Sequence, residues 1–220
     1  MRKQAIVVGL GQFGMSLATS LAHKGVEVLA VDQDEEKVRQ AASVVAEAIA
    51  FDATDELALA GTNPGSRDLC VCAIGNESRE GSIIATALLR QLGAKRLVAR
   101  GVDPLHERIL RLVGAHEVVN PEKAFGERYA MRLLYSDIVD EIVLGPGLVL
   151  TELHPPESFV GRSLAALGLP RRFQVNVVAV RRPDGETVEL PDPNRPLTPD
   201  DLLLVVSRPG AVGALLEKVS

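Results

Sequence analysis

The chain has few of the residues that define metal, redox and disulfide proteins. Its 220 residues include two cysteines, no tryptophan and 3% aromatic residues. Cys70 and Cys72 stand two residues apart in an apolar segment, so on a strand their side chains share one face. The sequence offers no second cysteine pair to complete a zinc site. We therefore expect both thiols to be small core residues of a protein from a reducing compartment.

Long apolar runs and an excess of positive charge are also absent. No stretch of about 18 apolar residues occurs, which predicts that the chain does not span a membrane. Residues 1–4 lead directly into a predicted strand, which leaves no room for a signal peptide. The formal net charge of -5 gives no broad basic surface for nucleic acid. We expect a cytoplasmic protein with no nucleic-acid partner.

The residue patterns of common catalytic sites are missing too. The four histidines form no H-x-x-x-H pair, and neither a G-x-S-x-G turn nor a Tyr-x-x-x-Lys pair occurs. A dehydrogenase needs a proton donor held beside its cofactor. The sequence therefore predicts a protein that is not an enzyme. An NAD-dependent oxidoreductase or redox sensor with a minimal substrate site is the alternative.

What the chain does have is a regular alternation of short apolar runs and helical patterns. Hydrophobic residues make up 46% of the sequence, which suits a parallel sheet buried on both faces. Six such βα units before residue 121 are typical of an α/β fold with a doubly wound, Rossmann-like parallel sheet. The carboxyl ends of its strands are expected to open onto one crevice, at the switch between the first and fourth strands.

The pattern changes after the sixth strand. Residues 121–136 predict one long crossover helix that starts with Pro121, a favoured first-turn residue. Residues 137–220 alternate as strands and predict a small α+β domain, with a hairpin turn at residues 183–185. We therefore divide the chain into a nucleotide-binding domain, residues 1–136, and a second domain, residues 137–220. The second domain is small enough that we expect it to dimerise.

A glycine-rich turn follows the first predicted strand. Gly9, Gly11 and Gly14 match the G-x-G-x-x-G spacing of a phosphate-binding turn, in which a new helix directs free N–H groups at the phosphates. Alone, the triplet also fits an ordinary strand-to-helix turn. Asp32 strengthens the nucleotide interpretation, because it ends the second strand about twenty residues later, where an acid binds the ribose hydroxyls. Asp32 could instead cap the next helix, although Asp34 is better placed for that role.

Several segments together resemble a known regulatory family. The resemblance is to the RCK domains of the cytoplasmic subunits of Trk and Ktr potassium-uptake systems, and it covers nearly the whole chain. Such subunits are not enzymes: they form homodimers that assemble into a ring, typically an octamer. The ring docks on the inner face of the membrane, on a TrkH- or KtrB-like potassium-translocating subunit. The resemblance rests on the segments "VVGLGQFGMSLATSLAHKGVEVLAVDQDEEKV", "DATDE", "CAIGNE", "DPLHERILRLVGAHEVVNPEKAFGERYA" and "TELHPPESFVGRSLAALGLPRRFQVNVVAV".

The resemblance implies a nucleotide in the crevice, either ATP or ADP or, as in some members, NAD(H). The glycines would hold phosphate, Asp52 and Ala53 would flank the adenine, and Arg100 would reach the nucleotide. Ktr subunits usually carry an arginine where this chain has Gln12, so we expect little preference for ATP over ADP. The implied nucleotide-binding residues are Gly9, Gly11, Gln12, Phe13, Gly14, Asp32, Gln33, Asp52, Ala53, Thr54, Ala73, Ile74, Gly75, Arg100 and His106.

Two further sites are implied by the same resemblance. Glu122 matches an acid that in some Ktr subunits helps to hold a divalent cation, Mg²⁺ or Ca²⁺, near the phosphates. It could equally be a first-turn helix acid favoured by the helix dipole. Some members bind cyclic di-AMP between C-terminal domains, and Arg171, Arg172 and Asn176 lie in the corresponding segment. This chain has Pro170 where those members have an arginine.

Overall fold

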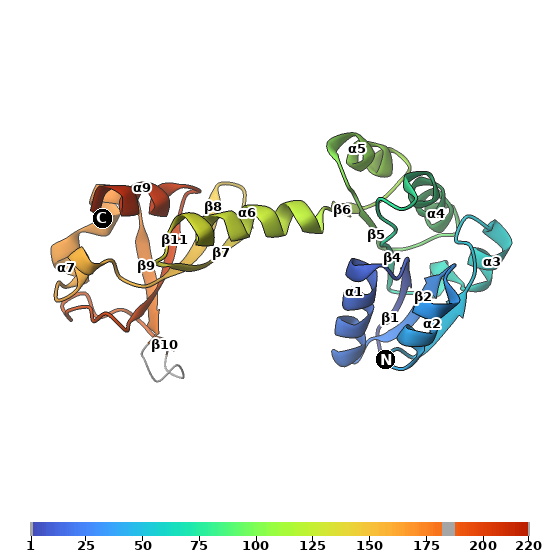
Figure 1. Ribbon diagram of the computed structural model, residues 1–220, viewed down its shortest axis with the longest axis horizontal. Coiled ribbons are helices and arrows are strands. Elements are labelled where there is room, and N and C mark those ends of the chain that lie inside the picture. The colour runs from blue at the N-terminus through green and yellow to red at the C-terminus, as the bar shows by residue number, and fades with distance from the viewer. Residues whose placement is uncertain (1, 182–187, 220) are drawn as a thin grey trace. The chain divides into compact units, whose positions relative to one another are not determined.

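The computed structural model describes residues 2–181 and 188–219 and divides into two compact units, residues 1–121 and 122–220. The first unit is a parallel six-stranded sheet in the order β3-β2-β1-β4-β5-β6 (Figure 1). This order confirms the doubly wound fold predicted from the sequence. The strands are β1 (Gln4–Val8), β2 (Glu27–Asp32), β3 (Glu47–Ala50), β4 (Leu69–Cys72), β5 (Leu97–Arg100) and β6 (Glu117–Val119).

Helices cover both faces of this sheet, because alternate strand residues point to opposite sides. On one face, Ile6, Val8 and their neighbours pack against α4 and α5, whereas Val7 and Val28 on the other face pack against α1. Alanines of β2 and α2 complete the second face. The helices are α1 (Gln12–His23), α2 (Glu35–Ala42), α3 (Glu56–Gly61), η1 (Pro64–Ser66), α4 (Arg79–Gln91) and α5 (Pro104–Leu112).

The two cysteines lie on one face of β4, as their spacing predicts. Both side chains are fully buried in the core beneath α4 and α5, and neither forms a disulfide. Burial raises the pKa of the Cys70 thiol to about 11 and also raises the pKa of Cys72. Both thiols therefore stay protonated, and neither is a ready nucleophile or metal ligand.

The strand order reverses between β1 and β4. β1 pairs in parallel with β2 on one side and with β4 on the other. The chain therefore leaves β1 and β4 for helices on opposite faces of the sheet, and the loops at their carboxyl ends diverge. A crevice between such loops is where doubly wound folds bind ligands.

The second unit begins with α6 (Pro121–Leu134), which ends two residues before the predicted residue 136. Three residues after the helix, the carbonyl of Asp137 accepts a hydrogen bond from His154 N, where the chain joins the second sheet. The antiparallel sheet has the order β10-β9-β11-β8-β7. The predicted turn at residues 183–185 lies outside the described residues. The elements are β7 (Ile138–Gly145), β8 (Leu148–Leu153), η2 (Glu157–Phe159), α7 (Leu164–Leu167), α8 (Leu169–Phe173), β9 (Asn176–Arg181), β10 (Val188–Glu189), β11 (Leu202–Ser207) and α9 (Ala211–Val219).

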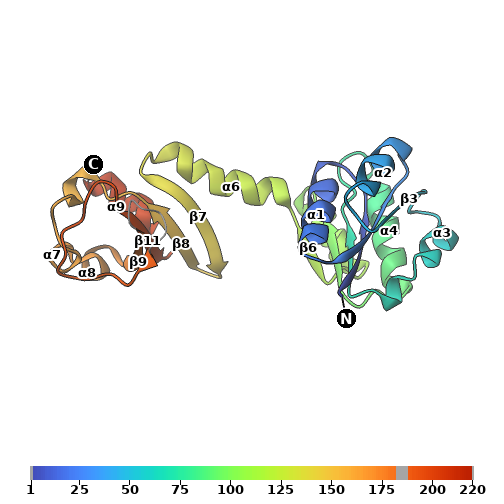
Figure 2. The ribbon, with the colours of Figure 1, turned by 90° about the horizontal axis from the view of Figure 1, so that it is seen from below.

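One face of this second sheet forms its core. Leu215 and Leu216 of α9 pack with Leu203 and Val205 of β11, and Figure 2 shows α9 beside that strand. Tyr135, just after α6, joins this core and donates a hydrogen bond to Glu217 over 2.9 Å. Residues far apart in the second unit thus hold one another in place.

Candidate nucleotide-binding site

The turn after β1 requires glycine for steric reasons that the structure makes explicit. Gly9 has a φ of +92°, and a Cβ there would lie 2.7 Å from the backbone nitrogen of Ile74. A Cβ on Gly14 would lie 1.8 Å from the carbonyl oxygen of Gly9. Gly11 caps the start of α1 without a side-chain hydrogen bond. The backbone can therefore approach a phosphate at the positive end of the helix.

Asp32 joins this turn to the end of β2. Its Oδ2 accepts a hydrogen bond from Leu10 N over 2.6 Å, and its Oδ1 accepts one from Asp34 N over 2.9 Å. The side chain is 9% exposed and lies 4.0 Å from the ammonium of Lys37. A carboxylate offers about four acceptor positions, so these two bonds leave capacity for ribose hydroxyls. Asp32 therefore holds the glycine turn in place as well as facing the crevice.

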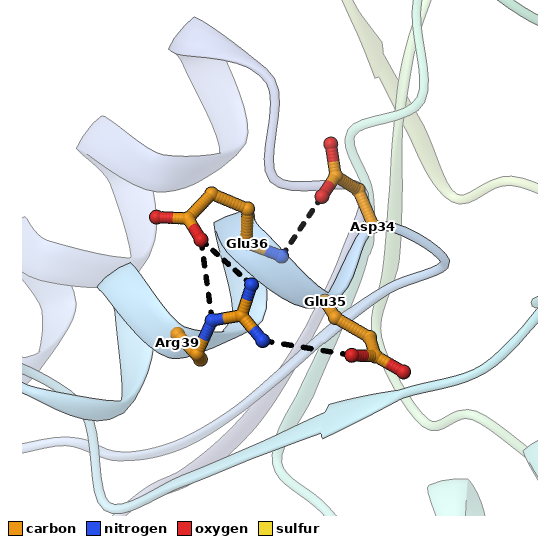
Figure 3. Close-up of polar contacts among 4 residues, drawn as sticks. All are labelled: Asp34, Glu35, Glu36 and Arg39. Atoms are coloured by element: carbon orange, nitrogen blue, oxygen red, sulfur yellow. Dashed lines mark hydrogen bonds and ion pairs between the residues drawn. The ribbon is translucent and has the colours of Figure 1, made fainter.

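Asp34, and not Asp32, caps the next helix. Its side chain accepts a hydrogen bond from Glu36 N over 2.9 Å at the start of α2 (Figure 3). Arg39, in the last turn of α2, pairs with the first-turn acids Glu36 at 2.7 Å and Glu35 at 3.5 Å. This arrangement confirms the capping role expected for Asp34 and frees Asp32 for the crevice.

A cavity of about 360 Å³ opens at the carboxyl ends of β1, β2, β3 and β4. Phe51, Ile74 and Ile84 give it an apolar wall suited to an adenine ring. Its charged residues are mostly acidic, with Lys37 the one positive side chain among its described lining. The lining residues are Val8, Gly9, Asp32, Gln33, Lys37, Phe51, Asp52, Ala53, Thr54, Ile74, Glu77, Ser78, Glu80, Gly81 and Ile84.

About half of the predicted nucleotide-binding residues line this cavity directly. They are Gly9, Asp32, Gln33, Asp52, Ala53, Thr54 and Ile74. The remainder lie around the glycine turn and the end of β5, outside the cavity wall. These are Gly11, Gln12, Phe13, Gly14, Ala73, Gly75, Arg100 and His106.

Asp52 and Thr54 form a small polar turn at the end of β3. Asp52 accepts hydrogen bonds from Thr54 N at 2.9 Å and from the Thr54 hydroxyl at 2.8 Å. The backbone bond, followed by the hydroxyl bond, lowers the pKa of Asp52 below its ordinary value. The side chain is thus a fixed carboxylate at neutral pH, able to accept hydrogen bonds from a base or ribose.

Arg100 and His106 occupy different environments. The Arg100 guanidinium lies against Gly75, where Nη1 would be 2.5 Å from a Cβ, and 6.0 Å from the Phe13 ring centre. It therefore stands at the phosphate side of the crevice. His106 is 3% exposed, and neither ring nitrogen has a hydrogen-bond partner among the described residues. Desolvation lowers its pKa, so it is a buried neutral side chain at the start of α5.

Sequence reasoning missed the residues that follow β4. Ser78 caps α4 by accepting a hydrogen bond from Gly81 N over 3.1 Å, and Glu77 and Glu80 flank it in the cavity wall. The sequence did contain a signal for these residues, since the β4–α4 turn adjoins the predicted switch point. Lys37, Phe51 and Ile84 were missed as well, because a side chain's direction within a helix or strand end depends on packing.

A second cavity, of about 430 Å³, lies in the C-terminal unit. Arg171 and Asn176 both line it, together with Pro170. Arg172 points elsewhere: its guanidinium lies 5.2 Å from the Phe173 ring centre and donates to Leu167 O over 3.4 Å. The structure thus brings together two of the three residues predicted for a second ligand.

Glu122 is the second residue of α6, within its first turn. That position fits the helix-dipole interpretation as well as the cation interpretation. No group of three or more histidine, cysteine, aspartate or glutamate side chains in residues 2–181 and 188–219 is arranged to hold a metal ion. Within the same residues, no helix is both long and apolar enough to cross a bilayer.

Comparison with protein families separates the same two units. The TrkA-N domain model matches residues 5–121, which contain the glycine turn and Asp32, and the TrkA-C domain model matches residues 148–220. The chain belongs to the TrkA-N and TrkA-C domain family. This TrkA-type chain is 31% identical over 206 residues to Ktr system potassium uptake protein C of Bacillus subtilis strain 168, covering 94% of this chain and 92% of that protein. It is 33% identical over 204 residues to Ktr system potassium uptake protein A of Vibrio alginolyticus, covering 93% and 92%.

Solved structures show the same fold for this TrkA-type chain. The GsuK channel bound to NAD superimposes with a TM-score of 0.66 at 18% identity. The match covers all of this chain and 40% of the channel chain, so the chain spans less than half of that protein. At this identity the likeness establishes the fold, while the relationship to potassium-uptake proteins rests on the sequence matches.

Proposed function

We propose that this protein is the nucleotide-sensing regulatory subunit of a Trk- or Ktr-type potassium transporter. The observation that carries the proposal is the crevice itself, in which a sterically obligatory glycine turn, an adjoining carboxylate and an apolar wall meet at the switch point. Both relatives named above are potassium-uptake proteins, and they match this chain over nearly its full length.

The ligand is an adenine nucleotide, ADP, ATP or NAD(H). Asp32 excludes a 2′-phosphate, because a second negative group would meet the carboxylate at hydrogen-bond distance. A bound nucleotide regulates transport by binding one conformation of the assembly more tightly than the other. The acidic lining makes the number of phosphates a natural source of that difference.

The proposed regulatory role requires two kinds of partner, further copies of this chain and a membrane subunit. We infer a homodimer that assembles into a ring, and the resemblance to RCK domains implies that the ring is an octamer. The ring docks on the inner face of a potassium-translocating membrane subunit. One side of α6 supports self-association: Phe125, Tyr129 and Leu133 lie four residues apart on one face and are 63%, 42% and 73% exposed. Apolar surface of this kind is typical of an interface. Glu122, at the start of the same helix, remains a candidate cation ligand in that assembly.

A catalytic role is disfavoured by the lining of the crevice. Its described residues include no histidine, cysteine or tyrosine, and its one lysine lies beside Asp32. His106, a predicted site residue, is buried outside the cavity wall. An oxidoreductase would need a proton donor beside the nicotinamide, so we propose a binding role.

Calorimetric titration of the nucleotide-stripped protein with ADP, NADH and NADPH tests the proposal. We expect ADP or NADH to bind and NADPH to be excluded. In Asp32→Asn the negative charge is gone, so the affinity ratio of NADPH to NADH should rise at least about tenfold, since one charge interaction at short range is worth that much. Asp68→Asn, at the opposite end of the sheet where Asp68 binds Gln4 N, is the matched control.

Co-purification then separates a transporter subunit from another nucleotide-binding protein. The tagged protein, expressed with a potassium-translocating membrane subunit, should be retained with it in a detergent extract.

In the titration, NADPH binding equal to that of NADH would contradict the ligand assignment. Steady-state hydride transfer to a carbonyl substrate would instead revive the oxidoreductase alternative.

A further inference from the structure

The carboxylate of Glu77 lies over the glycine turn. Its Oε1 is 3.3 Å from the position that a Cβ on Gly11 would occupy, and its Oε2 is 3.1 Å from the corresponding position at Gly75. Gly11 is the residue at the start of α1 whose missing side chain lets the backbone approach a pyrophosphate. An acidic group of the protein therefore stands where the phosphates of a nucleotide would bind.

The surrounding charges are of both signs. The Arg100 guanidinium lies against Gly75 beside Glu77, so the carboxylate also competes with a phosphate for this arginine. Asp32, Asp52 and Glu80 also line the cavity, and Lys37 lies 4.0 Å from Asp32 at the ribose end. The first turn of α1 contains no acidic residue, and its first residue is the neutral Gln12. A carboxylate at the positive end of a helix is itself favourable. Glu77 thus gains from its own position while it repels a phosphate at the same place.

We propose that Glu77 is a specificity-determining residue that makes the crevice disfavour each added phosphate charge. The inference rests on the proposed nucleotide-binding function and defines its ligand class. Without a divalent cation, the crevice selects NAD(H) and ADP over ATP, because the triphosphate carries the greatest negative charge past Glu77. A bound nucleotide must either move this carboxylate aside or bind beside it. The electrostatic cost of either increases with the negative charge of the ligand.

The exposure of Glu77 sets the size of its effect on the ATP to ADP affinity ratio. Glu77 is an exposed residue of the β4–α4 turn, so water and salt screen its charge. Neutralising it should raise the ratio of ATP to ADP affinity by up to about fivefold, the upper end of the range for one exposed charge interaction. Adenosine carries no phosphate, and its affinity should not change.

Titration calorimetry with adenosine, ADP and ATP in EDTA tests this on the full chain. The variant is Glu77→Gln, which keeps the size of the side chain and removes the charge. Glu47→Gln is the matched control, because Glu47 is an exposed residue at the amino end of β3, whereas the crevice lies at the carboxyl ends of the strands. We expect the ATP to ADP ratio to rise only in Glu77→Gln, and the difference from the unmodified protein to shrink in high salt.

Each other outcome contradicts the inference. An unchanged ATP to ADP ratio in Glu77→Gln shows that the carboxylate does not act on phosphate. An equal change in Glu47→Gln shows an effect of net charge alone. If neither adenosine nor ADP binds the unmodified protein, the proposed function itself fails and this inference falls with it. If ADP binds but the ATP to ADP ratio does not depend on Glu77, the proposed function stands and only this inference fails.

Discussion

At the scale of single residues, the crevice depends on two glycines that have no side chain. Gly9 and Gly14 approach neighbouring backbone more closely than any side chain allows, which brings β1, α1 and the turn after β4 together. Asp32 then fastens the turn through Leu10 N. The proposed nucleotide binding and the stability of the N-terminal domain should therefore depend on the same few residues.

Gly14→Ala should destabilise the N-terminal domain. The new methyl group would lie 1.8 Å from the Gly9 carbonyl oxygen, so the helix must move away from the turn. We expect a loss of about 3 kcal/mol in unfolding free energy, the upper range for overpacking, together with a large loss of ADP affinity. Urea denaturation measures the first effect and calorimetry the second.

Gly61→Ala is the matched control for that substitution. A Cβ on Gly61, the last residue of α3, would meet no atom within 4 Å. Its unfolding free energy should stay within about 0.5 kcal/mol of the unmodified protein. A Gly14→Ala protein as stable as this control would show that the turn is not close-packed.

His106 should make stability depend on pH. Burial holds its pKa below the ordinary value, while Asp103 raises and Arg79 lowers it to a smaller extent. Below about pH 6.5 the unfolded chain binds a proton that the folded chain does not. Stability is therefore fully present above that pH and is lost as the pH falls toward the folded-state pKa. Urea denaturation at pH 7.5 and 5.5 should show a smaller loss in His106→Leu.

The exposed His23, at the end of α1, supplies the comparison. His23→Gln should lose as much stability between the two pH values as the unmodified protein does. Equal losses in His106→Leu and His23→Gln would mean that the folded protein accommodates a charged His106.

At the scale of elements, the α-helices that follow β2, β3, β4 and β5 each begin with a side-chain cap. Asp34 caps α2, Asp55 caps α3, Ser78 caps α4 and Asp103 caps α5. Among α1 to α5, α1 alone starts without a side-chain cap, at Gly11. Its N–H groups thus remain available to a ligand, which is a physical reason to place the phosphates there.

Asp34→Ala should weaken α2 without changing the crevice. Loss of the cap costs about 1 kcal/mol in unfolding free energy, whereas ADP affinity should be unchanged because Asp34 does not line the cavity. Glu35→Ala removes the same charge from the same turn and should cost less than about 0.5 kcal/mol, since its pair with Arg39 is exposed. Equal losses in thermal or urea unfolding would argue that charge, and not capping, explains the effect.

At the scale of the whole molecule, α6 has no buried residue. The rings of Phe125 and Tyr129 stack with centres 5.5 Å apart on its surface. We expect a second copy of the chain to cover this side of the helix. The double variant Phe125→Ser, Leu133→Ser should then lower the mass of the assembly in light scattering coupled to gel filtration.

The matched double variant is Leu57→Ser, Leu105→Ser. These leucines, on α3 and α5, are 85% and 68% exposed, so the same amount of apolar surface is removed elsewhere. Its assembly mass should equal that of the unmodified protein. An unchanged mass in the α6 variant would assign self-association to another surface.

Much of the geometry of the candidate site could be predicted because its signals are local. Gly9, Gly11 and Gly14 lie within six residues, and Asp32 follows at the end of the next strand, so spacing alone places them together. The alternation of apolar runs likewise predicted six parallel strands in a doubly wound sheet, with the switch between the first and fourth strands. The crossover helix was predicted to within two residues of its end, and the hairpin turn at residues 183–185 lies outside the described residues.

The sequence by itself determined the fold class, the glycine turn and the carboxylate beside it, because these depend on periodicity and short spacing. Only the tertiary structure placed Glu77 against Gly11, since 66 residues separate them and pairing of β1 with β4 brings them together. It also separated Arg172 from Arg171, although the two are adjacent in the chain. Side-chain direction depends on which neighbours pack around it, and those neighbours come from distant parts of the sequence.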